Sequence, residues 1–238
     1  MTPLSGRGPS PHPPRHGLFL SFEGGDSAGK STQIALLREH LISQRHVAEE
    51  LVLTTREPGG TELGSRIRDL VLHGGHVDPR AEALLYAADR AHHVATVVAP
   101  HLDRGGLVLA DRYIDSSVAY QGAGRELDAA QVRTLSLWAT GGLMPHRTIL
   151  LDLPPEALDE RRSIDSLDRL ERAGREFHRA VRRQFLQLAE DDPERFVVID
   201  ASGSRKDVHA AVLAAIATEL EAFDPSPESS PQSPAAPE

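Results

Sequence analysis

Residues 18–32, LFLSFEGGDSAGKST, give the clearest indication of how this chain folds. This stretch begins as an apolar run of strand length, passes through a glycine-rich turn and opens a segment with helical spacing. Within it, Gly24 and the later Gly29-Lys30-Ser31 fit the pattern G-x-x-x-x-G-K-[ST] in the strand-to-helix context that this phosphate-binding loop requires. The glycines permit a tight polyphosphate cradle, the lysine reaches the β and γ phosphates, and the serine binds Mg²⁺. Many proteins share this loop, so the motif alone does not say where the phosphate goes.

Four more apolar runs of strand length follow along the chain, each ending in a polar or glycine-containing turn. Segments with helical periodicity separate them. This alternation, with strands that are apolar almost throughout, predicts an α/β fold with a five-stranded parallel sheet covered by helices on both faces. Ligands on such sheets bind at the carboxyl ends of the strands. The five predicted strands are LFLSFEG (18–24), ELVLTTRE (50–57), LVLADRY (107–113), RTILLDL (147–153) and FVVID (196–200).

The predicted helices carry apolar residues spaced three or four apart, and each stripe is expected to face the sheet. The stripes are Ile34, Leu37 and Leu41; Leu63, Ile67, Leu70 and Val71; Leu84, Leu85 and Ala88; Val132, Leu135, Trp138 and Ala139; Phe177, Val181, Phe185 and Leu188; and Val208, Val212, Ile216 and Leu220.

The composition limits the partners of the chain. A net charge of -9 over 238 residues leaves no excess of cations for a nucleic-acid backbone, so no nucleic-acid partner is expected. The absence of cysteine fits a reducing compartment. We find no signal peptide and no apolar run of about 18 residues, so we expect a soluble cytoplasmic protein without a membrane partner. Residues 1–16 and 224–238 are rich in proline, glycine or serine and are expected to be disordered tails around one domain, 17–223.

Arginines and aromatic residues recur where the other predicted strands end or where a helix follows. Arg56, Arg90 and Arg112 are accompanied by Tyr86 and Tyr120. Convergence of these side chains would create a site for a second anionic ligand that contains a base. The alternative is that each arginine is a surface ion-pair partner.

Five segments together resemble the thymidylate kinase family of bacterial type, in register from Leu18 to Ala222. The resemblance implies the P-loop NTPase fold of nucleoside monophosphate kinases. It also implies ATP-dependent phosphorylation of dTMP to dTDP with Mg²⁺, by a homodimer. The segments are the phosphate loop, TREPGG (55–60), LLYAADRAHH (84–93), DRYIDSSVAYQG (111–122) and LDRLE (167–171).

For ATP, the resemblance implies that the whole loop holds the phosphates, with Lys30 as its catalytic cation. Ser31 and Asp111 are the implied Mg²⁺ ligands, and strand-end capping is the alternative role of Asp111. The implied ATP-binding residues are Gly24, Gly25, Asp26, Ser27, Ala28, Gly29, Lys30, Ser31 and Thr32.

For dTMP, the resemblance implies that Arg112 holds the phosphate and that Tyr86 stacks on thymine while Arg90 bonds to its O4. The ring of Tyr120 crowds the 2′ carbon of the sugar and thereby favours deoxyribose. The peptide before Pro58 is expected to be cis, as in the family. The other implied substrate-binding residues are Asp26, Arg56, Ser117 and Gln121.

One departure from the family concerns the catalytic arginine. Some members carry an arginine in the phosphate loop, where this chain has Ser27, so the arginine must come from a lid at about 158–172. We expect Arg161 or Arg162 to be the catalytic arginine, with Arg169 next in line. Arg172 and Arg175 are interpreted as ion-pair partners on a solvated helix.

Other P-loop proteins fit the sequence less well. A GTPase needs an N-K-x-D segment, and the chain has no asparagine. Partition-type ATPases usually carry an extra lysine early in the loop, whereas this loop begins Gly24-Gly25-Asp26. An interaction module with a vestigial site would leave Lys30, Ser31 and Asp111 idle. A kinase for another monophosphate or for a deoxynucleoside stays open as an alternative.

Overall fold

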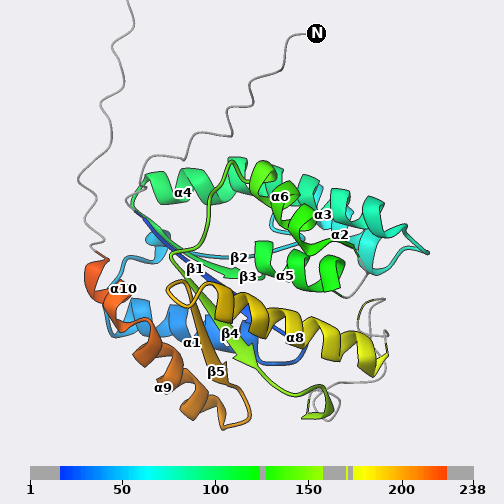
Figure 1. Ribbon diagram of the computed structural model, residues 1–238. Helices are drawn as coiled ribbons and strands as arrows, with labels where there is room; N and C mark the ends of the chain where they lie inside the picture. Colours follow the sequence, from blue (N-terminus) through cyan, green and yellow to red (C-terminus); the bar gives the residue numbers. More distant parts are fainter. Residues whose placement is uncertain (1–16, 124–126, 158–169, 171–173, 224–238) are drawn as a thin grey trace, which may run out of the picture.

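The computed structural model describes residues 17–123, 127–157, 170 and 174–223 (Figure 1). The predicted tails lie outside the described residues, and so does the predicted lid except for Leu170. No helix in the described part of the chain combines the length and the apolar character needed to cross a bilayer.

The sheet has five strands in the order β2-β3-β1-β4-β5, and every neighbouring pair is parallel, as predicted. Three strands are shorter than expected, β4 by only one residue. Residues 49–51 form a 3₁₀ turn before β2, and Arg112 turns away after β3 with a φ of 71°. The strands are β1 (Leu18–Gly24), β2 (Val52–Arg56), β3 (Leu107–Asp111), β4 (Arg147–Asp152) and β5 (Phe196–Asp200).

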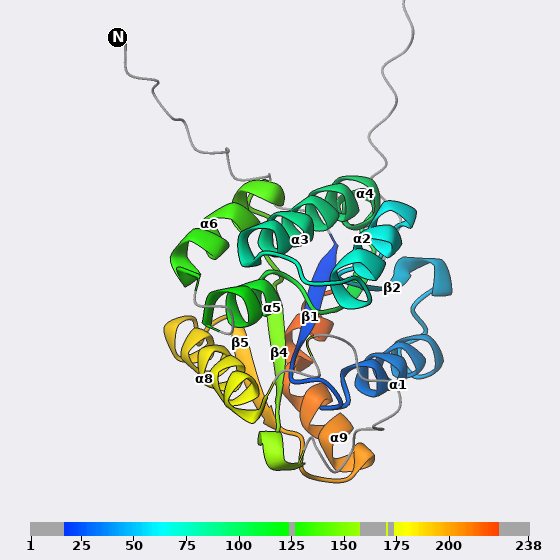
Figure 2. The same cartoon turned by 90° about the vertical axis from the view of Figure 1, so that its right-hand side faces the viewer.

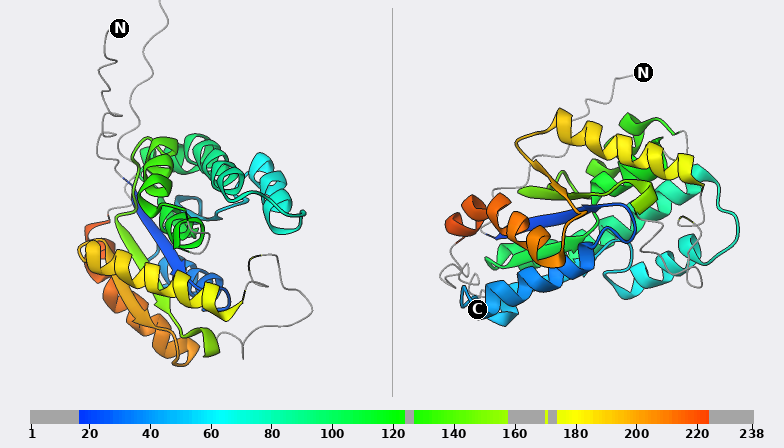
Figure 3. Two further views of the ribbon diagram at one scale, coloured as in Figure 1. Left: turned by 45° about the vertical axis from the view of Figure 1, so that its right-hand side comes forward. Right: turned by 90° about the horizontal axis from the view of Figure 1, so that it is seen from below.

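Helices cover both faces of this sheet, which confirms the predicted architecture (Figures 1 and 2). One face is covered by α1, α9 and α10, and the other by α2 to α6 together with α8; α1 and α9 lie against each other (Figure 3). The helices are α1 (Lys30–Ser43), α2 (Glu62–Leu72), α3 (Pro79–His93), α4 (Ala99–Asp103), α5 (Ile114–Ser117), α6 (Ala129–Ala139), α8 (Arg175–Asp191), α9 (Arg205–Ala215) and α10 (Ala217–Ala222), with π-helical turns η2 (Val94–Val98) and η3 (Val118–Ala123).

The central strand β1 explains why two separate apolar layers form. All seven of its residues are buried, and successive side chains point to opposite faces. Leu20 and Phe22 pack in the layer of α1 and α9, whereas Phe19 packs on the other side with Tyr113, their ring centroids 4.9 Å apart. The strand that carries the phosphate loop is therefore held from both sides.

In three of the predicted apolar stripes, one or more side chains face solvent instead of the sheet. On α2, Ile67 is buried but Leu70 is 58% exposed; on α3, Leu84 is 57% exposed; on α6, Trp138 is 73% exposed. The inward positions of α3 and α6 are taken by site residues instead. Ser136 of α6, for example, is buried and accepts a hydrogen bond from Arg90.

Candidate active site

The phosphate loop joins β1 to α1 and needs glycine at its start. Gly24 has a φ of 129°, and a Cβ there would lie 2.4 Å from the carbonyl oxygen of Leu151 in β4. Ser27 in the same loop also adopts a positive φ, 67°, which is uncommon outside glycine. The loop thus lies directly against the neighbouring strand.

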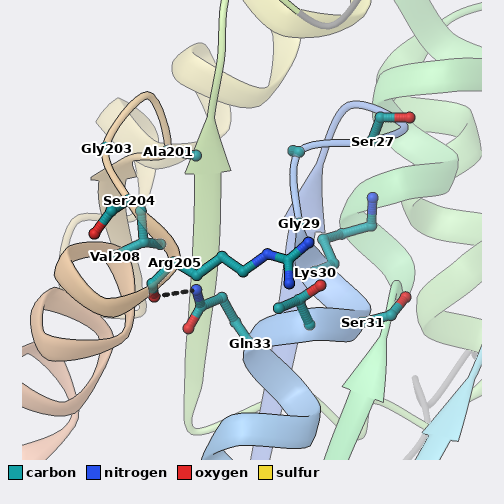
Figure 4. Close-up of a pocket in the computed structure, with 12 residues that line it drawn as sticks. Ser27, Gly29, Lys30, Ser31, Gln33, Ala201, Gly203, Ser204, Arg205 and Val208 are labelled. Carbon is teal, nitrogen blue, oxygen red and sulfur yellow. Dashed lines mark hydrogen bonds between the residues drawn. The ribbon is translucent and has the colours of Figure 1, made fainter. Parts of the chain in front are cut away.

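Beside this loop is a cleft of about 700 Å³, which we call the donor cleft. Its second wall is the turn from β5 into α9, and Gln33 of α1 donates to the backbone oxygen of Arg205 at 3.0 Å, tying the two walls together. The Arg205 side chain extends from α9 across the cleft toward Gly29 and Lys30 (Figure 4). The cleft is lined by Ser27, Ala28, Gly29, Lys30, Ser31, Thr32, Gln33, Ala201, Gly203, Ser204, Arg205 and Val208.

The ammonium group of Lys30 is folded onto its own loop. It donates to the carbonyl oxygens of Gly25 at 2.8 Å and Gly24 at 3.3 Å. Burial lowers the pKa of this lysine, and the nearby charge of Arg112 lowers it further. A phosphate that enters the loop would oppose both effects on this pKa, because a nearby negative charge favours the charged form of lysine.

The implied metal ligands lie together. The hydroxyl of Ser31 donates to Oδ2 of Asp111 at 2.7 Å, because β3 pairs with β1 and ends beside the loop. Within the described residues, no group of three or more His, Asp or Glu side chains could form an all-protein metal cage. Two oxygen ligands fit Mg²⁺, which in nucleotide sites takes its other ligands from phosphates and water.

A second pocket of about 60 Å³, the acceptor pocket, lies on the other side of Asp26 and is lined mainly by large side chains. It contains Asp26, Tyr86, Arg112, Tyr120 and Gln121 of the predicted substrate residues, and its remaining walls are Glu57, Pro58, Arg68, Leu72 and Leu170.

Arg112, Asp26 and Tyr120 form a closed set of contacts in this pocket. Arg112 pairs with one carboxylate oxygen of Asp26, and the hydroxyl of Tyr120 donates to the other at 3.1 Å. The guanidinium carbon of Arg112 lies 4.9 Å from the centroid of the Tyr120 ring. Burial raises the pKa of Asp26, but the charges of Arg112 and Lys30 outweigh it, so the net pKa is lowered and the carboxylate stays ionised.

Arg90 lies beneath the acceptor pocket, almost fully buried in protein contacts. Its Nε donates to Glu57 at 2.6 Å, and its terminal nitrogens reach Ser117 at 2.9 Å, Ser136 at 3.2 Å and the backbone oxygen of Tyr113 at 3.3 Å. The predicted pair Arg90 and Ser117 is therefore brought into direct contact. Four of the five N–H groups of this arginine are used, and neither Arg90 nor Ser117 lines the acceptor pocket itself; Glu57, which Arg90 contacts, does.

The two arginines on either side of the loop after β2, Arg56 and Arg68, line different clefts. The Glu57-Pro58 peptide is cis, as the family resemblance implied. Arg56 does not line the acceptor pocket; it lines a neighbouring cleft of about 540 Å³ that contains Ser31 and Asp111. Arg68 of α2 lines the acceptor pocket instead and donates to the backbone oxygen of Pro58 at 3.1 Å.

Sequence reasoning missed several residues of the site. The β5–α9 turn offers no charged motif, and the only signal was that it follows a strand. Glu23, the penultimate residue of β1, accepts hydrogen bonds from the backbone of Tyr113 at 2.8 Å and from Ser116 at 2.5 Å. Burial and the nearby charge of Asp115 raise the pKa of Glu23 from 4.5 to about 7. A carboxylate at the end of an otherwise apolar strand was its only signal. Arg161, Arg162 and Arg169 lie outside the described residues.

A phosphate loop with a serine and a strand-end aspartate, next to a second pocket built from arginine and aromatic side chains, defines the class of P-loop phosphotransferases that act on a small anionic acceptor.

Comparison with known proteins makes this more specific. The family model described as Thymidylate kinase matches residues 22–212. A thymidylate kinase of Clavibacter sepedonicus is 58% identical over 203 residues, covering 83% of this chain and 93% of that protein. One from Cutibacterium acnes is 50% identical over 198 residues, covering 82% and 94%. The crystal structure of thymidylate kinase from Ehrlichia chaffeensis superposes with a TM-score of 0.71 at 30% identity, covering 84% of this chain and 98% of that one.

The chain therefore belongs to the thymidylate kinase family. Its activity is the activity of that family, the ATP-dependent phosphorylation of dTMP to dTDP.

Proposed function

We propose that the donor cleft binds MgATP, that the acceptor pocket binds dTMP, and that the γ-phosphoryl group passes between them at Gly24. The observation that supports this is a shared hydrogen-bond acceptor. The carbonyl oxygen of Gly24 accepts from Lys30 at 3.3 Å and from Arg112 at 3.1 Å. The cation of the donor cleft and the cation of the acceptor pocket thus converge on one atom, so phosphates bound by them would be neighbours.

On the donor side, the loop and Lys30 hold the β and γ phosphates. Lys30 exchanges its bonds to loop carbonyls for bonds to phosphate oxygens, so the charge is already in place when the nucleotide binds. Ser31 and Asp111 would hold Mg²⁺, which neutralises charge on the β and γ phosphates.

On the acceptor side, Arg112 and Arg68 hold the dTMP phosphate, and Tyr86 stacks on thymine above Arg90. A phosphate oxygen of dTMP attacks the γ-phosphorus in line, the bond from that phosphorus to the β–γ bridging oxygen breaks, and ADP leaves with the electron pair. No general base is needed, because the attacking oxygen is already anionic. Asp26 keeps Arg112 oriented through their ion pair.

The transition-state charge is completed by the lid. We keep Arg161, Arg162 and Arg169 as the candidates for this role, since Ser27 leaves the loop without an arginine. Alanine variants that all retain the wild-type kcat would assign the charge to Lys30, Mg²⁺ and Arg112 alone.

The enzyme is proposed to work as a cytoplasmic homodimer, through a face that carries unusually exposed apolar residues. The neighbouring helices α2, α3 and α6 expose Leu70, Leu84 and Trp138 by 58%, 57% and 73%. Large apolar residues of this kind gather at interfaces. Light scattering of the purified chain checks this, and Trp138→Glu should yield monomer.

Residues 17–223 are proposed to suffice for folding and turnover, which a chain truncated to these residues tests.

The deciding experiment is steady-state turnover with four acceptors and two metal conditions. We expect dTMP to be used far better than UMP, dCMP or thymidine, and all turnover to stop when Mg²⁺ is chelated. The methyl group and O4 of thymine separate dTMP from dCMP, whereas the methyl group and the missing 2′-hydroxyl separate it from UMP. Equal rates with dTMP and dCMP would contradict the base-reading role of Arg90, and a preference for thymidine would reassign the acceptor pocket.

A further inference from the structure

A cluster behind the acceptor pocket ties the loop after β2 to helix α3. His93, fully buried at the end of α3, contacts Oε1 of Glu57 through Nδ1 at 2.8 Å and the hydroxyl of Thr55 through Nε2 at 2.7 Å. His93 itself lines neither the donor cleft nor the acceptor pocket, but it contacts Glu57, which is part of the acceptor-pocket wall. One ring nitrogen therefore contacts the end of β2 and the other contacts the loop that follows it.

Glu57 is the link between this histidine and Arg90. Its Oε2 accepts from Nε of Arg90 at 2.6 Å while its Oε1 faces His93, and the Glu57 side chain is only 1% exposed. A carboxylate held by two partners on one helix is restrained in orientation, and Glu57 is the charged partner among the four hydrogen bonds that hold the guanidinium of Arg90. Losing one partner leaves an oxygen of a buried carboxylate unpaired, which drives the group to another rotamer.

Gly60 of the loop packs closely against the histidine ring. A Cβ on Gly60 would lie 2.5 Å from Nε2 of His93 and 2.7 Å from Oγ1 of Thr55, so the loop backbone is pressed against the ring. Asp89, one turn earlier on α3, accepts from the backbone N–H of Gly59 at 3.3 Å. Helix α3 therefore holds two consecutive loop residues, Gly59 through Asp89 and Gly60 through the ring of His93.

We propose that His93 is a positioning residue for recognition of the acceptor base: by holding Glu57, it fixes Arg90 with one N–H group directed to the nucleobase. This deepens the proposed function and rests on the assignment of Arg90 to O4 of thymine. In thymine, O4 accepts a hydrogen bond, whereas cytosine presents an amino group at that position. A guanidinium that can rotate loses part of this discrimination, while transfer chemistry at Gly24 is untouched.

Two substitutions separate the contacts made by the two ring nitrogens of His93. His93→Asn retains an amide nitrogen at the place of Nδ1 and so keeps the Glu57 contact. His93→Gln places its amide near Nε2, keeps the Thr55 contact and gives up Glu57. Wild type and both variants are compared by kcat and KM for dTMP and dCMP, by KM for ATP and by thermal melting.

The expected result is that His93→Gln lowers the ratio of kcat/KM for dTMP over dCMP by about 10-fold or more, mainly through a higher KM for dTMP. The KM for ATP stays unchanged, and His93→Asn keeps a ratio close to wild type. If His93→Gln does not fold, Glu57→Gln, which keeps the size of the side chain and weakens its bond to Arg90, should shift the ratio in the same direction.

Two results overturn the proposal. Equal effects of His93→Asn and His93→Gln on the ratio, or a lower melting temperature with an unchanged ratio, leave His93 a purely structural residue. Failure of the proposed function looks different, because the wild-type enzyme would then show no preference for dTMP over dCMP at all.

Discussion

The donor cleft and the acceptor pocket adjoin the same loop but are lined by different kinds of residues. The donor cleft, about 700 Å³, is lined largely by small residues, with Lys30 and Arg205 as its cations. The acceptor pocket, about 60 Å³, is lined by side chains that already hold one another, such as Arg112, Asp26 and Tyr120. A ligand of the first is bound mainly by the shape of the backbone, and a ligand of the second by a preorganised side-chain network. Substitutions should therefore have local effects in the first and wider effects in the second.

The largest expected effects are on kcat and come from Lys30 and Arg112, the two cations that donate to the carbonyl oxygen of Gly24. Lys30→Ala and Arg112→Ala should each lower kcat by about 10²- to 10³-fold, because each removes a donor aimed at transferring charge. Only Arg112→Ala should also raise the KM for dTMP, since it holds the acceptor before transfer. Steady-state kinetics with each substrate varied measures both constants.

Two exposed cations serve as matched controls for these variants. Lys206→Ala on α9 and Arg66→Ala, whose ion pair with Glu62 is exposed, should leave both constants unchanged. An equal rise in the KM for dTMP in Lys30→Ala would show that the two regions are not separable.

The next effect concerns sugar selection in the acceptor pocket. Tyr120→Ala should raise use of the ribonucleotide relative to dTMP by about 10-fold or more, because steric rejection of one hydroxyl is worth about 1–3 kcal/mol. Tyr120→Phe keeps the ring but loses the bonds to Asp26 at 3.1 Å and Arg112 at 3.2 Å. It should therefore keep the sugar preference and raise the KM for dTMP. Competition between the two nucleotides gives the ratio, and identical ratios in wild type and Tyr120→Ala would remove Tyr120 from sugar selection.

A smaller effect is expected from the donor cleft. Arg205→Ala should raise the KM for ATP by about 3- to 10-fold and leave kcat and the KM for dTMP unchanged, since an exposed cation contributes little more than about 1 kcal/mol. The bond from Gln33 goes to the Arg205 backbone, so the wall itself survives the substitution. Titration with ATP at saturating dTMP tests this, and a change in the KM for dTMP would be the contrary result.

The smallest expected effect is on stability and comes from Glu23. Its pKa is raised by burial from 4.5 to about 7, so the folded chain binds this proton more tightly than the unfolded chain. Stability from this group is thus lost as the pH rises from about 4.5 to 7. Glu23→Gln cannot ionise and should reduce the fall in Tm between pH 5 and pH 8 by a few degrees. Melting curves at several pH values measure it; parallel curves for the two proteins would contradict the raised pKa.

The sequence was sufficient for the parts of the molecule that depend on local pattern. Five apolar runs became five parallel strands, and the phosphate loop lies where its motif required. Ser31 and Asp111 could be paired in advance because each follows a strand in the same sheet.

Other features depend on tertiary packing that no local pattern carries. Arg56 and Arg68 are both arginines near TREPGG, and only the packing of α2 turns Arg68 into the acceptor pocket. Trp138 fits an inward stripe by spacing, yet Ser136 takes the inward place because Arg90 needs a partner there. The β5–α9 turn could not be recognised, because small residues and backbone leave no distinctive sequence.

The central position of β1 bears on how the site opens and closes in solution. The phosphate loop follows β1, a strand in which all seven residues are buried. The other wall of the donor cleft follows β5, an edge strand in which Val198 is 46% exposed. Local unfolding at the edge costs less free energy than global unfolding. In hydrogen exchange, amides of β5 should therefore exchange through partial opening, and those of β1 only when the whole domain unfolds. Nucleotide could then leave through a loosened wall while the phosphate cradle keeps its shape for the next round.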